Sequence, residues 1–180
     1  MANLVLKRNV FEFDSQLYIQ KQGTAMGTKM APSFANIFMA ELERKLLDSV
    51  PLPPEVWWRF IDDCFSIWLY GEELLQEFID LINSFHPTIK FSMSSSTEKL
   101  PFLDILIHLK DGYLVTDLYE KPTDAHAYLH STSCHPQHVI RNMPFSQFLR
   151  LRRLCSDEAT FNQRANELET QLRRRGHNGR

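Results

Sequence analysis

The sequence predicts an α+β fold in which helices back an antiparallel sheet and a helical extension follows. Two kinds of pattern lead to this prediction. Short segments of alternating apolar and polar residues flank turn-forming residues, which is typical of β-hairpins. Longer segments carry apolar residues at intervals of three and four, which is typical of amphipathic helices. With 180 residues, 43% of them hydrophobic, the chain has about the size of one domain and can bury a core.

The first half of the chain alternates hairpins with a helix. The helix is expected to end at the prolines of residues 51–54, because proline cannot continue a helix. The loop ahead of it contains Gly23 and Gly27. The expected elements are, in order, a hairpin at 9–20, a loop at 20–32, a helix at 34–48 and a second hairpin at 58–68.

The second half runs from a helix through strands into a helical end. Asp111-Gly112 between two apolar segments is a good hairpin signal, and Asp157 is a suitable N-cap for the last helix. The expected elements are a helix at 72–85, strands at 89–93, 100–108 and 113–119, a loop at 121–138, and helices at 144–155 and 157–175.

Asp62 and Asp63 interrupt the apolar and aromatic stretch at 58–68, at the place where a tight turn would fall. Two neighbouring carboxylates repel each other unless a cation compensates them. Mg²⁺ is the natural compensator, because it prefers carboxylate oxygens together with substrate phosphates. The alternative is an ordinary Asp-rich turn between two core strands.

Charge is unevenly distributed along this chain, whose net charge is −2. Residues 141–180 contain nine arginines against four acidic residues, and the rest of the chain is acidic. A basic end favours an anionic partner, with nucleic acid as the first candidate. The alternative is a solvated helix surface on which Arg164 pairs weakly with Glu167 and Glu169. The arginines expected to contact phosphates are Arg150, Arg152, Arg153, Arg173, Arg174 and Arg175.

Three widely spaced cysteines indicate free thiols in a reducing, intracellular compartment. We expect no signal peptide, because the first ten residues carry Lys7 and Arg8 and no apolar core region. We expect no membrane partner, because no apolar run approaches the roughly 20 residues of a membrane span. Residues 126–138 contain four histidines and Cys134, which are enough ligands for zinc. No Cys-x-x-Cys pair accompanies them, so polar loop or nucleic-acid contacts are favoured over a zinc site.

These segments, in this order, resemble the palm of reverse transcriptases, most closely those of Penelope-like retroelements. The resemblance covers nearly the whole chain. The segments that carry it are Gln22 to Pro32 with Ala35-Asn36 and Met39, Arg59-Phe60-Ile61-Asp62-Asp63, His86-Pro87, Phe102-Leu103-Asp104, Leu118 to Asp124 and Ser133 to His138.

The resemblance implies an RNA-directed DNA polymerase with two metal ions, Mg²⁺ or its substitute Mn²⁺, held by aspartates. By position, Asp62 is the principal ligand and Asp63 its partner. Residues implied to contact nucleotide or template are Gln22, Gly23, Lys29 and Phe60. The implied partners are an RNA template, a DNA primer and deoxynucleoside triphosphates, in the nucleus. Residues 1–124 correspond to a partial palm, and residues 125–180 to the helix-turn-helix-like region that follows the polymerase core.

The sequence departs from the family pattern ahead of the hairpin at 9–20. The family places a third carboxylate on a separate strand there, after the fingers, and this chain starts beyond that point. Asp14 falls in a hairpin turn, which is not the position that the motif requires. We therefore expect the isolated chain to have little or no polymerase activity. The alternative function is a non-catalytic nucleic-acid-binding or interaction module that retains the palm fold.

Overall fold

The structure, a computed structural model, describes residues 3, 7–25 and 27–177; Met26 of the glycine-containing loop lies outside them. The described residues form seven strands and four helices, and every strand pair is antiparallel. The predicted α+β class is therefore confirmed. The strands belong to three small sheets rather than to one continuous sheet.

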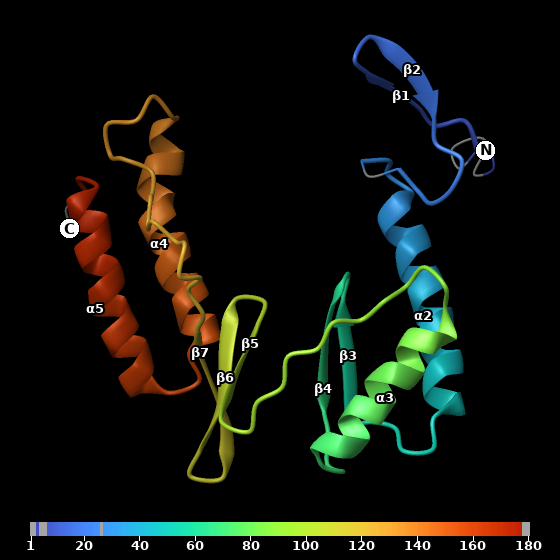
Figure 1. Ribbon diagram of the computed structural model, residues 1–180. Helices are drawn as coiled ribbons and strands as arrows, with labels where there is room; N and C mark the ends of the chain where they lie inside the picture. Colours follow the sequence, from blue (N-terminus) through green and yellow to red (C-terminus); the bar gives the residue numbers. More distant parts are fainter. Residues whose placement is uncertain (1–2, 4–6, 26, 178–180) are drawn as a thin grey trace. The chain divides into compact units, whose positions relative to one another are not determined.

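The chain divides into two compact units, Met1–Ser92 and Met93–Arg180. Figure 1 shows the elements of each unit, coloured along the sequence. The sequence predicted a boundary after residue 124, between the palm-like segment and the helix-turn-helix-like region. Because that boundary rests on a family resemblance and not on packing, the two compact units do not test it, and it stays a prediction.

The first unit contains two hairpins and two helices. The second hairpin carries the paired aspartates at its turn, and the two helices pack beside it (Figure 1). The elements are β1 (Val10–Phe13), β2 (Gln16–Ile19), α2 (Ala31–Ser49), β3 (Val56–Phe60), β4 (Asp63–Ile67) and α3 (Glu72–Phe85).

Two tryptophans join the β3–β4 hairpin to the helices. The ring centroid of Trp57 lies 6.1 Å from that of Phe78 on α3, and the Trp68 ring lies 5.1 Å from it. The core that they cover consists of Leu46, Val50, Phe78 and Ile82. One face of the hairpin is thus held by the helices, while Trp58 on the other face is 65% exposed.

The second unit combines a three-stranded sheet with a pair of helices. The strands follow the order β5-β6-β7, and the last strand runs into a loop that leads to the helices. The elements are β5 (Lys99–Phe102), β6 (Ile105–Lys110), β7 (Tyr113–Leu118), α4 (Gln137–Leu154) and α5 (Glu158–Arg174).

The helices pack side by side around a core of Leu151, Cys155, Leu168 and Leu172. The short turn between them is fixed to β7 by backbone contacts. The Ser156 amide donates to the Thr116 carbonyl at 3.0 Å, and the Thr116 hydroxyl donates to the Leu154 carbonyl at 2.7 Å. As predicted, Asp157 caps α5, accepting from the Thr160 amide at 2.9 Å.

A buried ion pair reinforces this attachment. The Asp117 carboxylate on β7 accepts from Arg164 Nε at 3.0 Å and from Arg164 Nη2 at 2.6 Å. Asp117 is buried, so the bidentate pair satisfies a charge that would otherwise be costly inside the fold. The helices and the sheet therefore form one compact body.

Three predicted elements are wrong in detail. The segment 100–108, predicted as one strand, forms the two strands β5 and β6, which a turn at residues 103–104 separates. Residues 89–93 do not form a strand, because the side chain of Asn83 accepts from the Phe91 amide at 2.6 Å and donates to its carbonyl at 2.9 Å. These bonds replace those that a neighbouring strand would provide. Helix α4 begins at Gln137 rather than at residue 144, and Pro144 lies inside it. Burial of Ile140 ahead of that proline stabilises the additional turns.

Among the helices that the structure describes, none combines the length and the apolarity needed to cross a membrane.

Candidate metal-binding turn and nucleic-acid interface

The two predicted metal ligands lie together at the tip of the β3–β4 hairpin. Phe60 pairs with Asp63 across the strands, so Ile61 and Asp62 form a two-residue turn. Both carboxylates are exposed, and neither makes a hydrogen bond or ion pair with any residue in the described part of the chain. Their oxygens are therefore available to a cation, as the prediction requires.

The turn has an unusual backbone. Ile61 adopts φ +57, the left-handed region that a β-branched residue rarely occupies. Such a conformation costs on the order of 1–3 kcal/mol and persists only where surrounding contacts enforce it. It brings Asp62 and Asp63 together at the tip, where Phe60, paired with Asp63, is also exposed.

Arg59 supplies the enforcing contacts. Its Nη1 donates to the Ile61 carbonyl at 3.1 Å and to Asn36 Oδ1 on α2 at 2.9 Å. Its Nε donates to Glu43 Oε1 at 2.8 Å, and Trp57 Nε1 donates to the same oxygen at 3.2 Å. The Arg59 and Glu43 side chains are only 10% and 13% exposed. The strained turn is thus attached to α2 through a largely buried charge pair.

Sequence reasoning missed the role of this network. Arg59 was part of the palm-like motif without a function of its own, and Glu43 was not considered. One signal was present: Arg59 is the only cation in the apolar stretch at 58–68, directly ahead of two acids.

Cys64 lies beside the network on β4, opposite Arg59. Burial is the main cause that raises the pKa of the Cys64 thiol to about 11, followed by the negative charge of Glu43. Arg59 opposes this increase in the pKa, and Asp63 and Asp62 add to it. The thiol therefore stays protonated at neutral pH and does not compete with the carboxylates for a metal ion.

The donor set at the turn fits part of a magnesium shell. Asp62 and Asp63 supply carboxylate oxygens, and Mg²⁺ usually completes its coordination with water and substrate phosphates. Among the residues described, no group of three or more His, Cys, Asp or Glu side chains is placed to hold a metal ion. The β3–β4 turn therefore offers two carboxylates to a metal ion.

The other residues predicted to contact nucleotide or template lie ahead of α2. Gln22, Gly23 and Lys29 are exposed. Gly23 has φ +76, and a Cβ there would meet Gln20 Nε2 at 3.3 Å, so a larger residue would be strained. No contact between these residues and the carboxylates is recorded in the described part of the chain.

Two of the four histidines of residues 126–138 bond neighbours in the loop that precedes α4. His130 Nδ1 lies 2.9 Å from the Thr132 hydroxyl, and His135 Nδ1 lies 2.7 Å from the Ser133 hydroxyl. Each of these contacts joins residues two positions apart and stabilises a turn of the loop. His138 lies on α4 rather than in the loop.

The six predicted arginines form two separate groups. Arg150, Arg152 and Arg153 lie near the C-terminal end of α4, and the others lie at the C-terminal end of α5. Because the two helices are antiparallel neighbours, the groups are separated by about the length of α5, roughly 25 Å for 17 residues (Figure 1).

Several of these arginines have partners within the second unit. Arg150 pairs with Asp104 at 2.8 Å, and Arg173 pairs with Glu169 at 2.6 Å. Arg175 Nε donates to the Tyr128 carbonyl at 2.6 Å, which fixes the preceding loop to the end of α5. The guanidinium of Arg152 lies 5.3 Å from the centre of the Phe161 ring.

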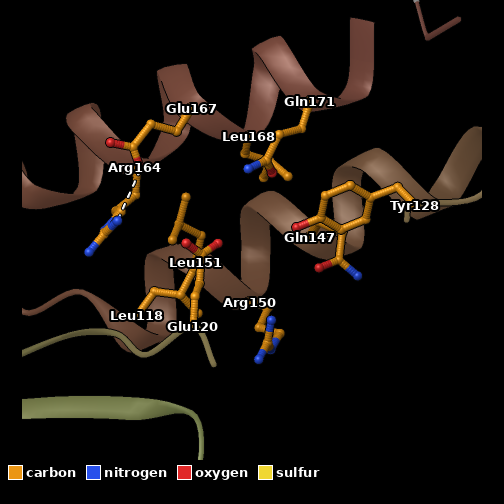
Figure 2. A pocket seen from close by; sticks show the side chains of 10 residues that line it. All are labelled: Leu118, Glu120, Tyr128, Gln147, Arg150, Leu151, Arg164, Glu167, Leu168 and Gln171. Atoms are coloured by element: carbon orange, nitrogen blue, oxygen red, sulfur yellow. Dashed lines mark hydrogen bonds and ion pairs between the residues drawn. The ribbon is translucent and has the colours of Figure 1, made fainter. Parts of the chain in front are cut away.

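Figure 2 shows the cavity between the two helices. Its volume is about 20 Å³, which is enough for a single water molecule and too small for a nucleotide. Arg164 and Glu167, bonded at 3.0 Å, lie at one end of the cavity, and Tyr128 lies at the other (Figure 2). The residues that line it are Leu118, Glu120, Tyr128, Gln147, Arg150, Leu151, Arg164, Glu167, Leu168 and Gln171.

Comparison with known families identifies the helical end of the chain. Residues 127–180 match the family described as animal helix-turn-helix domain, a match that includes both α4 and α5. No curated protein and no solved structure matches the chain. The predicted helix-turn-helix-like character of the C-terminal region is therefore confirmed, and this region is similar to animal helix-turn-helix domains.

Proposed function

We propose that the chain binds nucleic acid through its C-terminal helices. The match of residues 127–180 to a helix-turn-helix family carries this proposal. The charge of the region supports it, because residues 141–180 hold nine arginines against four acidic residues. An excess of arginine on a rigid pair of helices is suited to phosphate contacts.

Fluorescence anisotropy of labelled oligonucleotides with the full chain tests this proposal. We expect binding at about 50 mM salt and a linear decrease of log K with log salt up to about 200 mM, because phosphate contacts release counterions. Absence of binding at the lower salt concentration would contradict the proposal.

We further propose that residues 1–124 derive from the palm of an RNA-directed DNA polymerase. The turn with two unpaired carboxylates, held in a strained conformation by Arg59, favours this second function. Asp62 and Asp63 would hold the metal ion, with Asp62 as the principal ligand. The bound ions would lower the pKa of a primer 3′-hydroxyl and stabilise the pyrophosphate leaving group.

The remaining residues would position the substrates. Phe60, exposed beside Asp63, offers an apolar surface to a base or sugar. Gly23 would allow close approach of a nucleotide or template backbone, next to Gln22. Lys29, exposed ahead of α2, would contact a phosphate. Template RNA, primer DNA and deoxynucleoside triphosphates are the proposed partners.

We expect the isolated chain to have little or no polymerase activity, because two carboxylates hold the metal pair incompletely. Primer extension in Mg²⁺ and in Mn²⁺ measures this directly. Robust Mg²⁺-dependent extension that Asp62→Ala abolishes would overturn the expectation. Mn²⁺ binding by the wild-type chain but not by Asp62→Ala would favour the polymerase origin over the alternative, a non-catalytic module.

A further inference from the structure

Helix α4 carries exposed basic and apolar side chains. The helix contains four arginines and no acidic residue. Helix α5 contains three arginines and three glutamates, and two of these arginines are paired with glutamates on the same helix. The positive charge of the helix-turn-helix region is therefore concentrated on α4, the first of its two helices.

Five of the exposed side chains of α4 follow one stripe. Their spacing of three or four residues places them on one side of the helix, opposite the buried Ile140 and Leu151. We call this stripe the outward face of α4. Its members are His138, Arg141, Phe145, Leu149 and Arg152.

Packing does not account for this face. Phe145 is 70% exposed, so its ring does not contribute to the core. Arg141 has no hydrogen-bond or ion-pair partner in the described part of the chain, and it lies in the first half of α4. Neither residue stabilises the fold by a contact that the structure shows.

We infer that the outward face of α4 binds single-stranded nucleic acid, with Phe145 stacking on an unpaired base between phosphate contacts from Arg141 and Arg152. This inference rests on the proposed nucleic-acid binding and adds its location and substrate class. An exposed aromatic ring between cations is the combination that single-strand binding uses, whereas the bases of a duplex are already stacked.

The geometry of the face agrees with such a ligand. Arg141 and Arg152 are separated by about 16 Å along the axis, and Phe145 lies between them. The Phe161 ring beneath Arg152 orients its guanidinium, which leaves hydrogen-bond donors for a phosphate. Within the second unit, Phe145 and both arginines are exposed, so they are accessible to such a ligand.

Anisotropy titrations of the full chain with an oligo(dT) strand and with a hairpin duplex test the inference. We expect Phe145→Ala to weaken single-strand binding about tenfold, with a much smaller effect on the duplex. Arg141→Gln should reduce the salt slope for the single strand by about 0.7. Phe145→Leu, which keeps an apolar side chain without a flat ring, should lose affinity as Phe145→Ala does.

A matched control belongs to the same unit. Tyr113 is an aromatic residue with 77% exposure at the start of β7, outside both helices. Tyr113→Ala should bind the single strand as the wild type does.

The outcomes separate the inference from the proposed function. If the wild type binds and Phe145→Ala, confirmed as folded by circular dichroism, binds equally well, the inference is wrong and nucleic-acid binding stands. Equal losses on single strand and duplex would exclude base stacking. If the wild type binds neither oligonucleotide, both proposals fail.

Discussion

Arg59 is the residue on which the paired aspartates depend. It bonds the carbonyl of Ile61, whose φ of +57 is unfavourable for a β-branched side chain, and it joins this turn to α2 through Glu43. Charge-assisted bonds from a largely buried guanidinium can offset the cost of one strained residue. Contacts of Arg59 with α2, outside the turn, therefore fix the position of both carboxylates.

Arg59→Met should destabilise the first unit by about 3 kcal/mol, because it leaves Glu43 as an unpaired, largely buried carboxylate. All three tryptophans, Trp57, Trp58 and Trp68, lie in this unit, so urea unfolding followed by tryptophan fluorescence reports on it selectively. Arg44→Met is the matched control on α2, since its ion pairs are exposed and should contribute nothing measurable. Equal unfolding midpoints for Arg59→Met and the wild type would refute the role of Arg59.

Cys64 gives a pH-dependent prediction. Its pKa, raised to about 11 mainly by burial, leaves almost no thiolate near neutral pH. Since only the thiolate reacts, alkylation of Cys64 by iodoacetamide should be slow at about pH 8 and should accelerate about tenfold per pH unit below the pKa. Peptide mass spectrometry compares it with the exposed Cys134 in the same sample. Rapid alkylation of Cys64 near neutral pH would contradict its burial.

The sequence predicted the turn but not the contacts that hold it. Two acids interrupting an apolar stretch were sufficient to place Asp62 and Asp63 at a hairpin tip. The positive φ of Ile61 and the pairing of Arg59 with Glu43 were not predictable, because they depend on the packing of residues 16 positions apart. Tertiary contacts of this kind leave no local periodicity.

At the scale of elements, β7 determines how the helix-turn-helix region is attached. Thr116 bonds the turn between α4 and α5, and the neighbouring Asp117 binds Arg164 on α5. Two consecutive residues of one strand thus hold the turn and one helix. The helical pair is consequently continuous with the sheet rather than a separate appendage.

Arg164→Met should destabilise the second unit by about 3 kcal/mol, because it leaves the buried Asp117 carboxylate without its cation. Urea unfolding followed by far-ultraviolet circular dichroism should show the loss, while the tryptophan transition of the first unit stays unchanged. Arg173→Met removes an exposed pair on the same helix and serves as the control. A wild-type circular dichroism transition for Arg164→Met would show that the pair is dispensable.

Local patterns were informative for most elements and misleading for three. The apolar segment 100–108 was predicted as one strand, but a turn at residues 103–104 divides it into β5 and β6. The hairpins at 9–20 and 58–68 were predicted because alternation and turn residues are local signals. Residues 89–93 have the composition of a strand, but Asn83 satisfies the Phe91 backbone instead. The start of α4 was missed because Pro144 suggests a helix start, whereas burial of Ile140 extends the helix ahead of it.

At the scale of the whole molecule, the chain joins a unit whose β3–β4 turn carries two unpaired carboxylates to a unit with a basic helical pair. The helix-turn-helix match belongs to the second unit. The palm-like origin that we propose for residues 1–124 would extend over both units, and nucleic acid would then be a ligand of both. Charge composition predicted the basic end, but only the structure shows that α4 carries an unpaired arginine, Arg141, and the exposed Phe145.

Photochemical crosslinking tests the location of the bound strand most directly. The full chain would be irradiated with a single strand that carries photoreactive thymine analogues, digested with trypsin and analysed by mass spectrometry, with excess unmodified strand as the control. Cleavage after Arg141 and Arg150 releases residues 142–150, which include Phe145. Our account predicts that the competable crosslink lies in this peptide. Crosslinks confined to peptides of α5 or of the first unit would contradict it.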